Sequence, residues 1–296
     1  MSHSKPTSQF GLSCALALPL KPDSNIDFSR LGQHARRSLD TGCSSITVFG
    51  TTGEGPSISL NEREQILETL STAGIPLRQQ VLAGIAAASI GDAAQQARLL
   101  IERDCRGMLL APPFYFKNVT DEGLYRWFSR LFDTIGSQIH DVFLYHIPSV
   151  TQAPLSVELI ARLKTAFPQV IAGVKDSGGD WAYTEKLLRT HSDLVILIGD
   201  ERHLAAGLRL GAQGAISGLA NLFPERLSQL IESKQDDGAV VELVNEVLQF
   251  PVTPAVKALL AYRLNDPAWL MMRPPLVALT KQEAAHLADA YRRLFA

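Results

Sequence analysis

The feature that most constrains the fold is a repeat of short apolar runs between residue 12 and about residue 220. These runs alternate with longer stretches of helical period, and most are apolar on both faces, as buried parallel strands are. The eight runs cover residues 13–18, 45–49, 81–85, 107–111, 141–145, 170–175, 195–199 and 212–217. Eight strand–helix units predict a closed (β/α)8 barrel, because an open doubly wound sheet normally needs fewer units.

The segments between the runs predict amphipathic helices. One of them begins with a capping box, in which Ser59 and Glu62 each satisfy an orphan amide at the helix start, and it ends at Gly74. The helical segments that we expect between the runs include residues 61–73, 93–103, 124–135, 157–166, 181–190 and 202–210.

The pattern changes after Pro224. Residues 226–234, 239–248, 254–264 and 281–295 have helical period without an intervening strand. We therefore predict a (β/α)8 barrel over residues 1–223 and an all-helical C-terminal extension over residues 224–296.

Composition and charge exclude several classes of protein. A net charge of −2 over 296 residues gives no electrostatic reason to expect nucleic acid or an anionic membrane as a partner. No apolar stretch approaches the ~20 residues that span a bilayer, and residues 12–20 fit a first buried strand better than a signal peptide. The three cysteines lie in apolar stretches, which favours buried thiols and a cytoplasmic protein. The histidines lack metal-ligand spacing.

Lys175 closes the sixth apolar run and leads into a glycine-rich segment, residues 176–180. Partial burial of an ammonium group lowers its pKa and leaves more free amine at neutral pH. A free amine attacks ketones and forms a Schiff base. The alternative is a lysine that merely extends to the rim of the barrel. Lys257 is a second apolar-flanked lysine, but it lies within a helix of the extension, and we interpret it as structural.

Two other run ends carry polar groups. Residues 50–55 (GTTGEG) form a turn rich in exposed amides and hydroxyls, which suits a carboxylate or a phosphate, although it could be only a tight turn. Tyr145 can donate and accept a proton, and His146 titrates near neutrality. Functional groups of a (β/α)8 barrel gather at the carboxyl ends of its strands, so these residues are candidates for one site.

Three motifs closely resemble, in order, the signatures of the dihydrodipicolinate synthase / N-acetylneuraminate lyase superfamily. They are residues 50–55, residues 145–148 (YHIP) and residues 173–180 (GVKDSGGD), and the resemblance covers nearly the whole chain. Enzymes of this superfamily are (β/α)8 barrels, commonly tetramers, which bind pyruvate or another 2-oxo acid as a Schiff base on the lysine. The resemblance implies a homotetramer or homodimer, with no metal or organic cofactor.

The resemblance also implies roles for individual residues. Lys175 would form the imine, and Tyr145 would shuttle protons as imine and carbon–carbon bonds form or break. The carboxylate of the 2-oxo acid would be held by the turn after the second strand, with a catalytic contribution from one of its hydroxyls. The substrate-binding residues implied in this way are Thr51, Thr52, Gly53, Gly199 and Ile216, and Thr52 is the catalytic hydroxyl.

Three positions depart from the pattern of dihydrodipicolinate synthases. Val150 stands where those enzymes usually have an arginine that meets the carboxylate of the aldehyde substrate. Phe116 stands where a second tyrosine usually crosses a subunit interface, unless a one-residue shift places Tyr115 there. His146 stands where asparagine is more usual. We therefore treat Val150, Phe116 and His146 as candidate specificity residues.

The leading hypothesis is a class I aldolase that converts a 4-hydroxy-2-oxo acid to pyruvate and an aldehyde, or the reverse. The segment of residues 175–180 (KDSGGD) resembles 4-hydroxy-2-oxoglutarate and 2-keto-3-deoxy sugar-acid aldolases, and Val150 suggests an aldehyde without a carboxylate at that point. Three alternatives stay open: dihydrodipicolinate synthase, a dehydratase of 2-oxo-3-deoxy sugar acids, and a non-catalytic barrel that binds 2-oxo acids.

Overall fold

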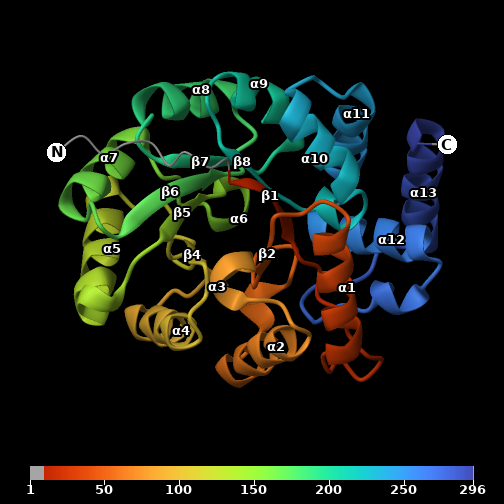
Figure 1. Ribbon diagram of the computed structural model, residues 1–296, viewed down its shortest axis with the longest axis horizontal. Coiled ribbons are helices and arrows are strands. Elements are labelled where there is room, and N and C mark those ends of the chain that lie inside the picture. The colour runs from red at the N-terminus through yellow and green to blue at the C-terminus, as the bar shows by residue number, and fades with distance from the viewer. Residues whose placement is uncertain (1–9, 296) are drawn as a thin grey trace.

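The computed structural model describes residues 10–295 and has a closed barrel of eight parallel strands at its centre (Figure 1). Each strand pairs with its neighbours in sequence, and β1 pairs with β8 to close the barrel. The predicted (β/α)8 fold is therefore confirmed. The strands are β1 (Gly11–Ala15), β2 (Ser45–Val48), β3 (Val81–Ile85), β4 (Gly107–Leu110), β5 (Val142–His146), β6 (Ile171–Asp176), β7 (Val195–Ile198) and β8 (Gly214–Ser217).

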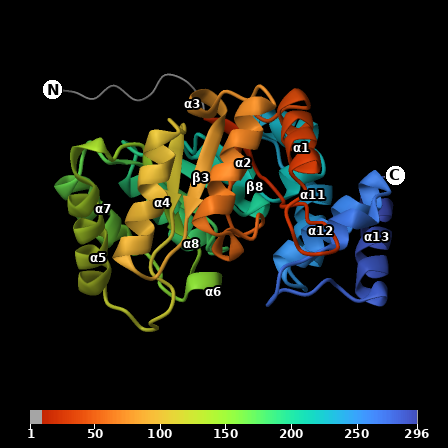
Figure 2. The same cartoon turned by 90° about the horizontal axis from the view of Figure 1, so that it is seen from below.

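Helices surround the barrel and follow its strands (Figures 1 and 2). The expected capping box is present, because Ser59 Oγ accepts from the amide of Glu62 at 3.3 Å and Glu62 Oε2 accepts from the amide of Ser59 at 2.9 Å. The helices up to β8 are α1 (Phe28–Asp40), α2 (Leu60–Thr72), α3 (Leu77–Gln80), α4 (Ile90–Glu102), α5 (Asp121–Ile135), α6 (Pro148–Thr151), α7 (Val157–Ala166), α8 (Trp181–Thr190) and α9 (Leu204–Arg209).

Four helices follow β8: α10 (Pro224–Ser233), α11 (Gly238–Val247), α12 (Val252–Leu264) and α13 (Lys281–Phe295). Helix α10 contacts β1 and α9, whereas α13 packs on α11 and α12. Figures 1 and 2 show α12 and α13 together at one side of the molecule, away from α5 and α7. The division of the chain at residue 224 stays a prediction.

The hydrophobic core has two parts. The larger part lies between the strands and the surrounding helices, and a smaller cluster fills the inside of the barrel. The inner cluster includes Leu82, Leu109, Phe143, Leu197 and Ile216, all buried. Because side chains fill the barrel, a ligand must bind at a mouth, where the strands end. Within the described part of the chain, no helix combines the length and apolarity needed to cross a membrane.

Candidate active site

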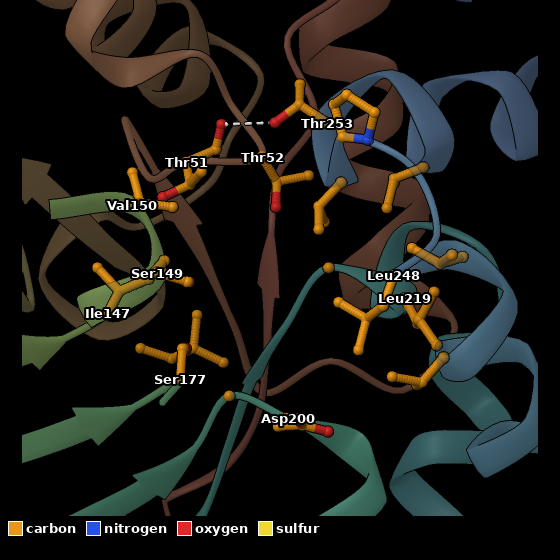
Figure 3. Close-up of a pocket in the computed structure, with 18 of the residues that line it drawn as sticks. Thr51, Thr52, Ile147, Ser149, Val150, Ser177, Asp200, Leu219, Leu248 and Thr253 are labelled. Atoms are coloured by element: carbon orange, nitrogen blue, oxygen red, sulfur yellow. Dashed lines mark hydrogen bonds between the residues drawn. The ribbon is translucent and has the colours of Figure 1, made fainter. Parts of the chain in front are cut away.

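A cavity of about 390 Å³ opens at the carboxyl ends of the strands. It brings together seven of the predicted site residues, and Figure 3 shows part of its lining. One side comes from the strand ends and the following loops, and the other side comes from α11, α12 and the segment between them. The predicted residues that line it are Thr51, Thr52, Tyr145, Val150, Lys175, Gly199 and Ile216.

Lys175 and Tyr145 are neighbours at the floor of this cavity. They lie on the adjacent strands β6 and β5, and the parallel register places them level with each other. Lys175 Nζ donates to Tyr145 Oη at 3.2 Å and lies 4.4 Å from the centre of the phenol ring. Both side chains are buried, with 6% of each residue exposed. A buried amine therefore lies within proton-transfer distance of a phenol.

The surroundings of Tyr145 lower the pKa of its phenol. Burial raises the pKa of the phenol, but the positive charge of Lys175 and polar contacts from Thr51, Lys175 and Ser177 lower it by more, so the pKa of Tyr145 is below its ordinary value. Tyr145 thus releases a proton more readily than a free tyrosine does.

The turn after β2 lines the cavity and contains two amides that have no protein acceptor among residues 10–295. Within the turn, the amides of Glu54 and Gly55 donate to the carbonyls of Thr51 and Gly50 at 3.1 and 3.0 Å. Among residues 10–295, no protein group accepts a hydrogen bond from the amides of Thr51 and Thr52. Unpaired amides at a turn are suited to an anion such as a carboxylate.

The C-terminal helices hold this turn in place. Glu54 and Lys257 form an ion pair at 2.7 Å, and both side chains are fully buried. The second carboxylate oxygen of Glu54 accepts from the amide of Arg273 at 2.9 Å, and Lys257 also donates to the carbonyl of Met271. Thr253 Oγ1 donates to the carbonyl of Thr51 at 3.0 Å, as the dashed line in Figure 3 shows. Lys257 therefore has a different role from Lys175, because it links α12 to the turn after β2.

Gly199 leaves room for the lysine. A Cβ atom at this position would lie 2.0 Å from Ser177 Oγ and 3.0 Å from Lys175 Cε. Gly53 also has close neighbours, since its Cβ would lie 2.7 Å from the carbonyl oxygen of Leu16, but Gly53 does not line the cavity. A substrate-binding role of Gly53 stays a prediction.

We expect Gly199→Ala to lower kcat/KM by about 100-fold, because a displacement of the lysine by about 1 Å costs a factor of this order. The new methyl group would lie 2.0 Å from Ser177 Oγ and 3.0 Å from both Lys175 Cε and the carbonyl oxygen of Asp176, so these groups would have to shift. Steady-state kinetics with a 2-oxo acid substrate would measure the effect. Gly91→Ala in α4 is the matched control, because its Cβ would meet no atom closer than 4.0 Å. Equal rates for the two variants would contradict this reading of Gly199.

The structure does not place His146 or Phe116 in the cavity. His146 is buried, stacks on Tyr183 with ring centres 4.0 Å apart, and accepts from the amide of Leu155 through Nδ1 at 3.1 Å. Phe116 is 73% exposed and touches Tyr115 edge to face. Val150 lines the cavity. The specificity roles of His146 and Phe116 stay predictions.

Burial lowers the pKa of His146 to about 4, from 6.5 in an exposed histidine. The unfolded chain therefore binds the proton more tightly, so the contribution of His146 to stability is present above pH 6.5 and is lost as the pH falls towards 4. We expect His146→Asn, which keeps an acceptor for Leu155, to reduce the acid-induced loss of unfolding free energy by roughly 2 kcal/mol. Urea titrations at pH 7 and pH 4.5 would measure it. Parallel pH curves for the two proteins would contradict the prediction.

Several residues that line the cavity were not predicted from the sequence. Asp200 and Glu201 directly follow Gly199, so the rule that function gathers at strand ends could have indicated them. Ser149 directly precedes Val150, and Ser177 lies two residues after Lys175. Further lining residues come from the C-terminal segment after β8, and nothing comparable in the sequence indicated them. They are Val244, Val247, Leu248, Pro251, Val252, Thr253, Pro254, Val256 and Leu276.

Comparisons with known proteins agree with this architecture. The profile of the dihydrodipicolinate synthetase family matches residues 9–293. A DapA-like lyase from Chloroflexus aurantiacus is 32% identical over 97% of each chain. The crystal structure of dihydrodipicolinate synthase from Agrobacterium tumefaciens has a TM-score of 0.95 and 48% identity, covering 97% of this chain and 100% of that one. YagE from Escherichia coli, solved in complex with pyruvate, has the same fold, with a TM-score of 0.86 at 20% identity over 96% and 98%.

The chain belongs to the dihydrodipicolinate synthetase family, as the three motifs indicated. Members of this family are lyases and include aldolases, which supports an enzymatic function for this chain.

Proposed function

We propose that this protein is a Schiff-base aldolase that splits a 4-hydroxy-2-oxo acid into pyruvate and an aldehyde, or joins the two. The observation that carries the proposal is the buried contact of 3.2 Å between Lys175 Nζ and Tyr145 Oη at the floor of an open cavity. Two buried polar groups at this distance, facing space for a ligand, are suited to proton transfer during a reaction of the amine.

Imine formation follows from this pair. The lone pair of the Lys175 amine attacks the C2 carbonyl carbon of the oxo acid, and the carbonyl oxygen takes up a proton. Tyr145 delivers that proton, takes one back from the amine nitrogen and passes it to the new hydroxyl group, so that the oxygen leaves as water and a protonated imine and an ionised phenol remain. The phenol oxygen lies 3.2 Å from the amine nitrogen, so it is close to the bonds that change at this step.

The imine then provides the electron sink for breaking the C3–C4 bond. The ionised phenol takes the proton of the C4 hydroxyl group, the C4 oxygen becomes an aldehyde carbonyl, and the electron pair of the broken bond moves into the imine to give an enamine. Protonation of C3 and addition of water release pyruvate and free Lys175. No oxidant or reductant is consumed.

The turn after β2 would hold the substrate carboxylate. The amides of Thr51 and Thr52 have no protein acceptor among residues 10–295, and Thr51 and Thr52 line the same cavity as Lys175. A carboxylate bound there would point the adjacent C2 carbonyl at the amine. Fixed orientation of this kind can supply several kcal/mol of the barrier. The predicted roles of Thr51, Thr52, Gly199 and Ile216 in substrate binding are part of this proposal.

One second candidate has a specific observation in its favour. The Agrobacterium tumefaciens structure, at 48% identity, carries the name dihydrodipicolinate synthase. Against that activity, Val150 lines the cavity where an arginine would meet the carboxylate of the aldehyde substrate, and no arginine lines it among the residues described. A dehydratase of 2-oxo-3-deoxy sugar acids would use the same imine.

A coupled assay would separate these activities. Pyruvate released from a panel of 4-hydroxy-2-oxo acids would be measured with lactate dehydrogenase and NADH, and the same enzyme would be incubated with pyruvate and aspartate semialdehyde. We expect pyruvate release and no condensation with aspartate semialdehyde. Condensation without retro-aldol activity would replace the aldolase proposal with the synthase. Loss of water from a sugar acid without pyruvate release would replace it with the dehydratase.

The predicted cytoplasmic location and homotetramer or homodimer stay predictions.

A further inference from the structure

The cavity has two chemically different halves. The floor and one side carry polar groups, which include Lys175, Tyr145 and the turn with Thr51. The opposite side, where Figure 3 labels Leu219 and Leu248, comes mainly from the C-terminal helices and is apolar. We call this side the distal wall. It consists of Leu219, Val244, Val247, Leu248, Pro251, Val252 and Leu276.

The charge in the cavity disfavours an anionic aldehyde. Among the residues described, Lys175 is the only cationic residue that lines it, and Lys175 is committed to the imine. The two other charged residues at the cavity are acidic, Asp200 and Glu201. A second carboxylate on the substrate would therefore find no further cation in the lining, and desolvating an unpaired carboxylate is costly.

Most polar groups near the distal wall already have protein partners. Asp200 accepts from the guanidinium of Arg202 at 2.6 and 3.0 Å, and Glu201 Oε1 accepts from the hydroxyl of Ser217. The hydroxyl of Thr253 donates to the carbonyl of Thr51 at 3.0 Å. A polyhydroxylated aldehyde against valine and leucine side chains would bury hydroxyl groups that lack partners, and each such group carries a desolvation penalty.

On the basis of the proposed aldolase function, we infer that the aldehyde partner is an uncharged, apolar aldehyde whose alkyl or aryl group packs on the distal wall. In the synthetic direction, C3 of the enamine on Lys175 attacks the aldehyde carbonyl carbon, which forms the C3–C4 bond. The carbonyl oxygen takes a proton and becomes the C4 hydroxyl group, and water releases the product from the lysine. This assignment differs from sugar-acid and 4-hydroxy-2-oxoglutarate substrates.

The test compares aldehydes of different polarity with pyruvate as the common donor. The panel contains isobutyraldehyde and benzaldehyde, D- and L-glyceraldehyde, and the anionic glyoxylate and succinic semialdehyde. We expect kcat/KM for the apolar aldehydes to exceed that for each polar or anionic aldehyde by at least about tenfold, since one methylene in an apolar pocket already contributes a factor of this size. A preference for glyceraldehyde or for an anionic aldehyde would overturn the inference.

A variant in the distal wall makes the test specific. Leu248 is 46% exposed, so Leu248→Gln leaves the core intact, and we expect it to lower kcat/KM for isobutyraldehyde by about tenfold. The matched control is Leu210→Gln, because Leu210 is 38% exposed and does not line the cavity. Equal losses in both variants, or no loss in Leu248→Gln, would contradict a role of the distal wall.

Borohydride trapping of the pyruvate adduct separates failure of this inference from failure of the proposed function. Wild type that yields no adduct on Lys175, with pyruvate or with larger 2-oxo acids, would refute both. Wild type that yields the adduct but condenses with none of the apolar aldehydes would refute only the inference.

Discussion

Lys175→Met lowers kcat/KM for cleavage of the 4-hydroxy-2-oxo acid by at least about 10,000-fold, the scale of loss when other covalent enzymes lose their nucleophile. The substitution keeps the length of the side chain and removes the amine that forms the imine. Lys175 is buried beside Tyr145, and no other described lysine lines the cavity. No other lysine can therefore replace it. Pyruvate release in the coupled assay measures the loss.

Lys186→Met is the matched control for this experiment. Lys186 lies on α8 and pairs with Glu158 at the surface at 2.5 Å, so its loss should leave the rate within a factor of about 2, as for most exposed ion pairs. Unfolding curves of both variants would exclude global destabilisation as the cause. A Lys175→Met enzyme that kept a tenth of the wild-type rate would contradict the covalent mechanism.

Lys257→Met destabilises the protein by about 3–5 kcal/mol, because it leaves the Glu54 carboxylate buried without its cationic partner. We expect the same change to raise KM for the 2-oxo acid, since Glu54 belongs to the turn with Thr51 and Thr52, which line the cavity. Urea unfolding and steady-state kinetics measure the two effects.

The double variant Glu54→Gln with Lys257→Met provides the control, because it removes both charges together. We expect it to recover at least half of the lost unfolding free energy, since a buried uncharged pair costs much less than one buried charge. Additive losses in the double variant would mean that the two residues stabilise the protein independently, contrary to their contact of 2.7 Å.

The barrel could be predicted from the sequence because parallel strands that are buried on both faces read as continuous apolar runs. The first and last residues of the strands could not be predicted in this way. The first run was expected over residues 13–18, whereas β1 spans Gly11–Ala15, because Leu16, Ala17 and Leu18 are buried beyond the end of the strand. An apolar run indicates which residues are buried. Burial alone does not determine where the backbone hydrogen bonds between neighbouring strands end.

Lys175, Tyr145 and Thr51 were also predictable, since each stands at or just after the end of an apolar run. The distal wall was not, because its position depends on contacts between residues about 200 apart in sequence. The pair of Glu54 and Lys257 and the bond between Thr253 and Thr51 bring α12 to the barrel mouth. His146 shows the converse: it stands at a strand end, but it follows Tyr145, which faces the inside of the barrel, so it points to the opposite face and stacks on Tyr183.

The most direct test of the central claim is the mass of the intact protein after incubation with pyruvate and borohydride, followed by peptide mapping. The account predicts one reduced pyruvyl group on wild type, located on Lys175, and none on Lys175→Met. An adduct that persists in Lys175→Met, or that maps to another lysine, would contradict the account. If neither pyruvate nor larger 2-oxo acids gave any adduct, the aldolase proposal would be wrong.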